Sequence, residues 1–471
     1  MRFPRASGIL LHPTSLPGPH GIGELGPEAF RFADWLAEAG QKIWQVLPLG
    51  PTGYGDSPYQ CFSAFAGNPL LISLDLLVDR GYLSGRDIAH DARFPRDRVD
   101  YGAVIQWKLP VLAKAAKAFF RQTCDRDDFD RFCDRNAHWL DHFAPFMAGK
   151  QLDFDEGVQR YWQFEFARQW SAVHEYCRRR GVRIMGDLAI YVAGDSSDVA
   201  SHPGLFRTDV VSGVPPDYFS AAGQLWGNPI YRWDKLKETG YEWWIDRFRA
   251  VLAQVDMVRV DHFRGFEAYW EIPAGDKTAV NGRWVNGPGA ELFHAVEARL
   301  GKMPIVAENL GVITPEVEAI RHELGYPGMS ILQFAFGKDP QGPSFRPHNY
   351  PRELVAYTGT HDNDTTLGWW TSEAGADSTR TTADIAAERD FAKRYLRTDG
   401  REMNWVFIQA IIASVADTVL VPLQDVLGVG SEARMNLPAR PDGNWQWRVR
   451  PESLRAEDAA RLCGLARMYD R

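Results

Sequence analysis

Cysteine is scarce in this sequence, and positive charge is not in excess. The five cysteines, at positions 61, 124, 133, 177 and 463, are odd in number, far apart and without a Cys-x-x-Cys pair. Reduced thiols in a cytoplasm fit this pattern best. The formal net charge of -8 argues against a surface that binds phosphates, so nucleic acid is not an expected partner.

Long hydrophobic runs are also missing. The most apolar long window, 405–423, contains Asp417 and Pro422 and predicts a buried helix followed by a strand. Near the start of the chain, Pro4 and Arg5 interrupt any apolar stretch of signal-peptide length. We therefore expect a soluble cytoplasmic protein with no membrane partner and no export.

What the sequence does contain is a series of short apolar runs separated by amphipathic stretches, such as 27–38 and 289–300. This alternation is typical of a parallel sheet covered by helices. Eight runs are candidate strands, and eight is the number in a (β/α)8 TIM barrel. The runs are 8–11, 42–47, 182–186, 257–260, 304–307, 330–334, 354–358 and 418–421.

The spacing of these runs is uneven, which predicts insertions into a single catalytic barrel that covers 1–471. Long segments separate the second run from the third and the third from the fourth, far beyond a simple connection. We expect large inserted, mainly helical subdomains at about 50–180 and about 190–255. A Pro/Gly/Asn-rich stretch, 212–229, indicates a loop over the barrel rim.

Three of the runs lead directly into an acidic residue, at Asp261, Glu308 and Asp362. The C-terminal ends of parallel barrel strands share one rim, so these acids are expected to meet around one substrate. Two facing carboxylates are the usual apparatus for cleaving a glycosidic bond. Any one acid at a strand end has the simpler alternative of being a cap or an ion-pair partner.

The neighbours of these acids suggest distinct roles. Strand alternation places Arg259 on the same side as Asp261, as an ion-pair partner for a nucleophile. The apolar residues before Glu308 predict a raised pKa, which suits a general acid. Asp362 is placed to bind sugar hydroxyls and distort the ring, and Asp187 to support it.

The sequence resembles the amylomaltases, the 4-α-glucanotransferases or disproportionating enzymes related to α-amylases. The likeness extends almost from end to end. The motifs that carry it are RVDHFRG at 259–265, AENLG at 307–311, THDNDT at 360–365, LHPTSLP at 11–17, LPLGPTGYGDSPY at 47–59, GVPPDYF at 213–219, EARMN at 432–436 and GNW at 443–445.

The resemblance implies a (β/α)8 barrel with Asp261 as nucleophile, Glu308 as acid/base and Asp362 as transition-state stabiliser. It implies a retaining transfer between α-1,4-glucans or maltooligosaccharides, with no metal or organic cofactor. The positions that match sugar-holding residues are Arg259, His361, Asp187, Ser57, Tyr59, Asp217, Trp226 and Asn436, and those that match a second, surface glucan contact are Tyr54 and Tyr101.

Two features depart from the family pattern. The residue after the acid/base is usually Asp in this family and is Asn309 here, which predicts a slightly less raised pKa for Glu308. The stretch 206–211 is shorter than the usual hairpin, which predicts a difference in product size or loop motion. A retaining α-1,4-glucan hydrolase is the main alternative function, because transfer and hydrolysis share one covalent intermediate.

Other signals point to weaker alternatives. Residues 21–26 match G-x-G-x-x-G, but Glu24 and the absence of a ribose-binding acid disfavour an NAD-dependent oxidoreductase. His138 and His142 lack a third ligand for a metal, and sugar binding explains the histidines beside Asp261 and Asp362 without zinc. A glucan-binding protein without catalysis would not need both Asp261 and Glu308.

Overall fold

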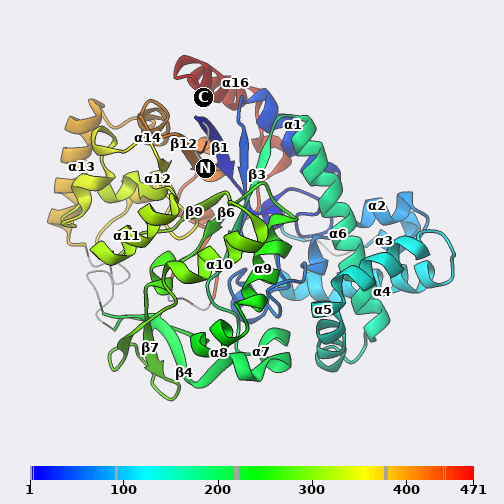
Figure 1. The fold of residues 1–471 in the computed structure, drawn as a ribbon. Helices are drawn as coiled ribbons and strands as arrows, with labels where there is room; N and C mark the ends of the chain where they lie inside the picture. The colour runs from blue at the N-terminus through cyan, green and yellow to red at the C-terminus, as the bar shows by residue number, and fades with distance from the viewer. Residues whose placement is uncertain are drawn as a thin grey trace.

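The computed structural model has an all-parallel, eight-stranded sheet at its centre (Figure 1). It describes residues 3, 5–90, 94–216, 222–375, 380–438, 440 and 442–471. The strands lie in the order β10-β11-β12-β1-β2-β3-β6-β9. Their bounds are β1 Ala6–Leu10, β2 Ile43–Gln45, β3 Arg183–Leu188, β6 Met257–Val260, β9 Ile305–Ala307, β10 Gly328–Ile331, β11 Leu354–Tyr357 and β12 Thr418–Pro422.

The two ends of this sheet meet and close it into a barrel. The Ala307 N–H at the end of β9 donates to the carbonyl oxygen of Pro327, directly before β10, at 2.9 Å. All eight predicted strands are present, and the predicted (β/α)8 barrel is confirmed.

Alternation along each strand divides the apolar side chains between two cores. One buried cluster takes members from all eight strands, including Met185, Met257, Val306, Met329 and Leu420. A cluster with a contribution from every strand is the filled interior of the barrel. The neighbouring residues face outward to the helices and belong to a second, larger core.

Helices outside the strand ring cover this larger core. Rings pack between them, as where Phe30 of α1 meets Tyr176 of α6 with 5.0 Å between centroids. Their bounds are α1 Pro27–Glu38, α6 Glu156–Arg179, α9 Glu242–Leu252, α10 Ala290–Leu300, α11 Pro315–Leu324, α12 Thr366–Thr371, α13 Thr382–Leu396, α14 Met403–Ile412, α15 Leu423–Leu427 and α16 Ala456–Met468.

The segment between β2 and β3 is helical, as predicted. Its helices before α6 are α2 Leu74–Asp79, α3 Gly85–Ile88, α4 Tyr101–Phe120 and α5 Arg126–Lys150, and they gather on one side of the barrel in Figure 1. Asp100 caps α4 by accepting from Ala103 N–H, and Asp155 caps α6 by accepting from Val158 N–H. Packed aromatic rings such as Phe119 and Tyr161 join these helices.

The segment between β3 and β6 is only partly helical. It contains α7 Ser197–Ser201 and α8 Trp233–Glu238, and also the antiparallel strands β4 Phe206–Val214 and β5 Gln224–Tyr231. Two later strands, β7 Ala268–Pro273 and β8 Arg283–Asn286, extend this sheet in the order β5-β4-β7-β8. The predictions of a mainly helical insert and of a loop at 212–229 therefore need correction here, because residues 212–214 and 224–229 belong to the paired strands β4 and β5.

Two further expectations can be compared with the fold. The glycine motif at 21–26 serves close packing, since a Cβ on Gly23 would lie 1.9 Å from the Pro13 carbonyl oxygen. Glu24 in the same motif is buried against Lys108 and His20. Among the described residues, no helix combines the length and the apolar character that crossing a membrane requires.

Candidate functional site

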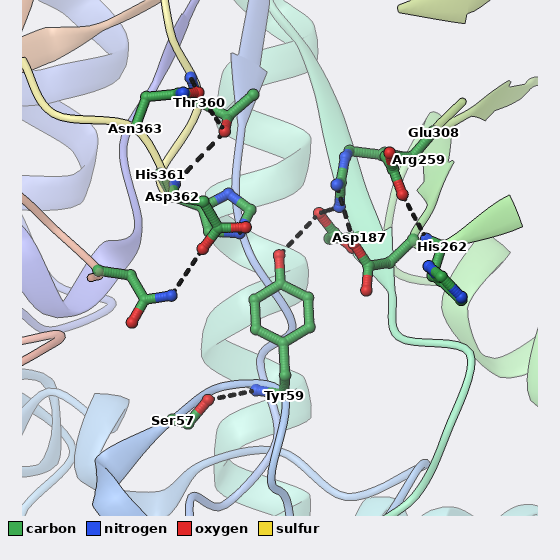
Figure 2. Close-up of polar contacts among 12 residues, drawn as sticks. Ser57, Tyr59, Asp187, Arg259, His262, Glu308, Thr360, His361, Asp362 and Asn363 are labelled. Carbon is green, nitrogen blue, oxygen red and sulfur yellow. Dashed lines mark hydrogen bonds and ion pairs between the residues drawn. The ribbon is translucent and has the colours of Figure 1, made fainter. Parts of the chain in front are cut away.

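The predicted acids lie at or after the C-terminal ends of barrel strands. Asp187 lies in β3, Asp261 and Glu308 directly follow β6 and β9, and Asp362 follows β11. Strand β6 pairs with both β3 and β9, which puts the first three acids side by side. Figure 2 shows Asp187, Arg259 and Glu308 on one side of Tyr59, with His361 and Asp362 on the other.

Arg259 ties two of these acids together. Its Nη1 donates to Asp187 Oδ2 at 2.7 Å, and its Nη2 lies 2.8 Å from Asp261 Oδ1. Asp187 and Arg259 are buried, whereas the Asp261 side chain keeps 26% of its exposure. Asp261 is therefore the member of this trio that a molecule in the cleft can reach.

Glu308 is buried, and main-chain groups hold its carboxylate. Oε2 accepts from His262 N–H at 2.8 Å, and Oε1 accepts from Leu310 N–H at 2.7 Å. His262 has a left-handed backbone with φ 48°. Burial raises the pKa of Glu308 to about 7, with Asp261 adding to the rise and Arg259 opposing it. The raised pKa predicted from the sequence agrees with this environment.

Asp362 is held by the segment that follows β12. Asn436 Nδ2 donates to Asp362 Oδ1 at 2.6 Å, and His361 Nε2 lies 3.4 Å from Oδ2. Arg434 donates from Nη2 to the Asp362 carbonyl and from Nε to the Asn436 carbonyl, at 2.6 and 2.7 Å. Arg434 was not among the predicted site residues, although it lies in the EARMN motif that signalled Asn436.

Tyr59 separates the two groups of acids. Its hydroxyl donates to Asp187 Oδ2 at 3.1 Å, and its ring stacks on His361 at 5.2 Å between centroids. Trp445 completes this aromatic group at 6.0 Å from Tyr59. Ser57 supports the turn by accepting from Tyr59 N–H at 3.2 Å. Stacked and tilted rings thus lie beside the carboxylates, and such rings offer apolar faces against which a sugar ring can pack.

Trp226 lies near the end of the site that carries Glu308. Its ring meets His262 edge to face at 4.7 Å, and its Nε1 donates to Gln224 Oε1 at 3.1 Å. Asp217, the remaining predicted sugar-binding residue, lies outside the described residues. The structure therefore brings Ser57, Tyr59, Asp187, Trp226, Arg259, His361 and Asn436 to the rim that carries Asp261, Glu308 and Asp362.

Tyr54 and Tyr101 behave differently from each other. Tyr54 is 77% exposed, as a surface contact requires. Tyr101 is only 5% exposed, and its hydroxyl donates to the Trp445 carbonyl at 3.0 Å. The prediction that Tyr101 is a surface contact is wrong for this structure, because Tyr101 begins α4 and packs its ring beneath the loop that carries Trp445.

Burial favours the neutral form of two histidines of the site. Burial lowers the pKa of His262 to about 4 and that of His361 as well. Among the described residues, the one cluster with metal-ligand spacing is His20, Glu24 and Asp75, away from these histidines. There the buried ammonium of Lys108 contacts Glu24 and donates to the Leu70 carbonyl at 2.7 Å.

Together, the barrel and its rim define a class of protein. A partly exposed aspartate paired with an arginine lies beside a buried glutamic acid on the next strand and a group of aromatic rings. This arrangement is typical of barrel enzymes that act on glycosidic bonds.

Comparisons with known proteins identify the family within this class. A family model described as 4-alpha-glucanotransferase matches residues 11–159 and 149–454. A 4-alpha-glucanotransferase of Thermus thermophilus is 48% identical, covering 100% of both chains. A Synechocystis 4-alpha-glucanotransferase is 46% identical, covering 99% of this chain and 98% of its own. The chain therefore belongs to the 4-alpha-glucanotransferase family.

Solved structures agree with this assignment. An amylomaltase from Streptococcus agalactiae in complex with acarbose superposes with a TM-score of 0.93 at 37% identity, covering 99% of each chain. An amylomaltase from Corynebacterium glutamicum shares the fold with a TM-score of 0.83 at 20% identity, over 98% of this chain and 75% of its own. The relatives favour glucan transfer over the hydrolase, oxidoreductase and binding-protein alternatives.

Proposed function

We propose that this enzyme transfers α-1,4-glucan segments by a retaining double displacement. In the first step, a carboxylate oxygen of Asp261 bonds to the anomeric carbon of the donor sugar. The glycosidic bond breaks, and Glu308 gives its proton to the departing oxygen. In the second step, the 4-hydroxyl of an acceptor glucan or glucose attacks the same carbon, Glu308 takes the proton, and the Asp261 carboxylate is released.

The contrast between Asp261 and Glu308 is the observation that carries this proposal. Asp261 is partly exposed and paired with the guanidinium of Arg259, as a nucleophilic carboxylate needs to be. Glu308 lies on the neighbouring strand, and burial raises its pKa to about 7, so that it can hold and release a proton near neutral pH. Two carboxyls in such different environments are matched to two different roles.

The remaining residues are proposed to hold the sugars. Asp362 and His361 lie on the opposite side of Tyr59 from Arg259 and Asp187. They would bind hydroxyls of the sugar whose bond breaks. Asn436 keeps Asp362 oriented. The other sugar-binding positions that we propose are Ser57, Tyr59, Asp187, Asp217, Trp226 and Arg259, with Tyr54 as an exposed contact for long α-1,4-glucans or maltooligosaccharides.

Transfer in place of hydrolysis would depend on the acceptor outcompeting water. An acceptor bound beside Trp226 and His262 gains proximity that bulk water lacks. An acceptor that occupies the space beside Trp226 would also exclude water from the ester.

We also propose an organisation and a location for the enzyme. Residues 1–471 would form one catalytic unit, with the inserts at about 50–180 and about 190–255 shaping the cleft. All five cysteines lie within the described part of the chain and are unpaired, which supports a location in the cytoplasm, where the enzyme would take part in carbohydrate metabolism.

The products of maltotriose test the reaction. Purified enzyme should yield glucose together with maltotetraose, maltopentaose and longer oligomers, as resolved by chromatography with glucose assayed separately. Glucose and maltose in hydrolytic proportion, with no longer product, would establish the hydrolase instead.

A further inference from the structure

Between β9 and β10, where the barrel closes, a side chain replaces one main-chain carbonyl as hydrogen-bond acceptor. The Ala307 N–H donates to the Pro327 carbonyl at 2.9 Å, as in a parallel ladder. The next bond of a regular ladder would run from Met329 N–H to the Ala307 carbonyl. Met329 N–H instead donates to Asn309 Oδ1 at 2.8 Å. The Asn309 side chain therefore completes the hydrogen bonding between β9 and β10 at the point where Glu308 follows β9.

The other half of the Asn309 amide is bound to α11. Its Nδ2 donates to Glu318 Oε1 at 2.8 Å. Arg321 pairs with Glu318 through Nε, at 3.2 Å from Oε1 and 3.1 Å from Oε2, and donates from Nη1 to the Tyr326 carbonyl at 2.7 Å. The contacts run from the end of β9 through α11 to the segment before β10.

Asn309 lies between the two residues that matter most for the proton transfer. Glu308 precedes it, and Leu310, whose N–H donates to Glu308 Oε1 at 2.7 Å, follows it. A rotation of the main chain at Asn309 would move both the glutamate and one of its donors. We infer that Asn309 is a positioning residue that fixes the height and direction of Glu308 at the barrel rim; this inference rests on the acid/base role proposed for Glu308.

The amide is matched to its two partners. Met329 offers an N–H and Glu318 offers a carboxylate, so the residue between them must accept on one side and donate on the other. In Asn309→Asp, the new carboxylate accepts from Met329 but turns its second oxygen toward Glu318, which leaves like charges in contact. Gly328 makes room for the native amide, since a Cβ there would lie 2.7 Å from Asn309 Nδ2.

Exchanging the two groups tests the inference. Asn309→Asp should lower kcat/KM for maltotriose about tenfold, because small misplacements of a catalytic group are costly. In the double variant Asn309→Asp and Glu318→Gln, the new glutamine amide can donate to the new aspartate, which reverses the wild-type hydrogen bond. This double variant should recover most of the lost activity. Glu316→Gln, an exposed residue of the same helix, is the matched control and should leave activity unchanged.

The pH profile separates positioning from general stability. The charge that Asn309→Asp introduces beside Glu308 should move the alkaline limb of kcat/KM to higher pH, whereas Asn309→Ala should lower kcat with the limb in place. Wild-type kcat/KM and an unmoved limb in folded Asn309→Asp, or a double variant no more active than the single one, would overturn the inference.

Two further variants keep the outcome decisive. If Asn309→Asp does not fold, Glu318→Ala removes the acceptor for Nδ2 and leaves the Met329 bond, so it should lower kcat several-fold with KM unchanged; wild-type kcat would overturn the inference. Glu308→Gln tests the proposed function separately. Full turnover in that variant would remove the acid/base role itself, while an inactive Glu308→Gln beside a wild-type-like Asn309→Asp would refute only the role of Asn309.

Discussion

The main-chain N–H of His262 donates to Oε2 of Glu308 at 2.8 Å. His262 directly follows Asp261, so the backbone at the proposed nucleophile also holds the proposed acid/base. Arg259, two residues before Asp261, completes the connection by pairing with Asp261 and Asp187. The end of β6 therefore carries one carboxyl and contributes to the placement of the other.

Removing either carboxyl should lower turnover strongly while the protein stays folded. We expect Glu308→Gln to lower kcat about 10²- to 10⁴-fold, the usual contribution of a general acid/base. Asp261→Asn should lose at least as much, because no ester can form. Disproportionation of maltotriose measures the loss, and circular dichroism checks the fold. Full turnover by either variant would refute its assigned role.

The activity should fall as the pH rises above neutral. Glu308 must carry a proton to protonate the departing oxygen, and burial raises its pKa to about 7. The kcat/KM of the wild-type enzyme should therefore begin to fall near pH 7. At high pH it should approach the residual kcat/KM of Glu308→Gln. A profile that stays flat to pH 9 would mean that Glu308 does not supply the proton.

The free energy of unfolding should also depend on pH because of the raised pKa of Glu308. The pKa of Glu308 is higher in the folded protein than in the unfolded chain, so the folded state binds more protons between the two values and loses stability as pH rises through that window. Glu308→Gln removes this loss. Its advantage in the free energy of unfolding over wild type, from urea titrations, should grow between about pH 4.5 and pH 7 and then level off.

Arg259 should be essential for stability as well as for activity. Its removal leaves Asp187 buried without its cation, and such changes cost about 3–5 kcal/mol of unfolding free energy. We expect Arg259→Gln to show a clearly lowered midpoint of thermal unfolding. Adding Asp187→Asn removes the stranded charge and should restore part of the midpoint; no recovery would mean that the Arg259–Asp187 pair does not account for the loss.

Tyr54 and Tyr101 should have opposite phenotypes. Tyr54→Ala removes an exposed ring and should weaken binding of long glucans while leaving maltotriose turnover unchanged. Tyr101→Phe removes the bond to the Trp445 carbonyl and should cost about 1 kcal/mol of stability, without an effect on glucan affinity. Binding assays with amylose and thermal unfolding separate the two; weakened glucan binding by a stable Tyr101→Phe would restore the surface role.

Some parts of the site could be predicted because their signals are local. The runs before Asp261 and Glu308 alternate or are apolar, and both end in an acid, which places the acid at a strand end without knowledge of the rest. The second sheet could not be found in this way. Strand β8 is exposed, and Trp284 becomes recognisable as part of a strand only through its pairing with Trp270 in β7.

The sequence by itself determined the eight strands, the positions of the acids and the resemblance that pointed to glucan transfer, because period and motif are properties of neighbouring residues. Only the tertiary structure decided which groups meet: Arg434 with Asp362, Tyr101 with Trp445, and Asn309 with Met329 and Glu318. Burial and hydrogen-bond partners depend on segments that are distant in the chain and meet only in the folded barrel. The local sequence pattern therefore does not predict them.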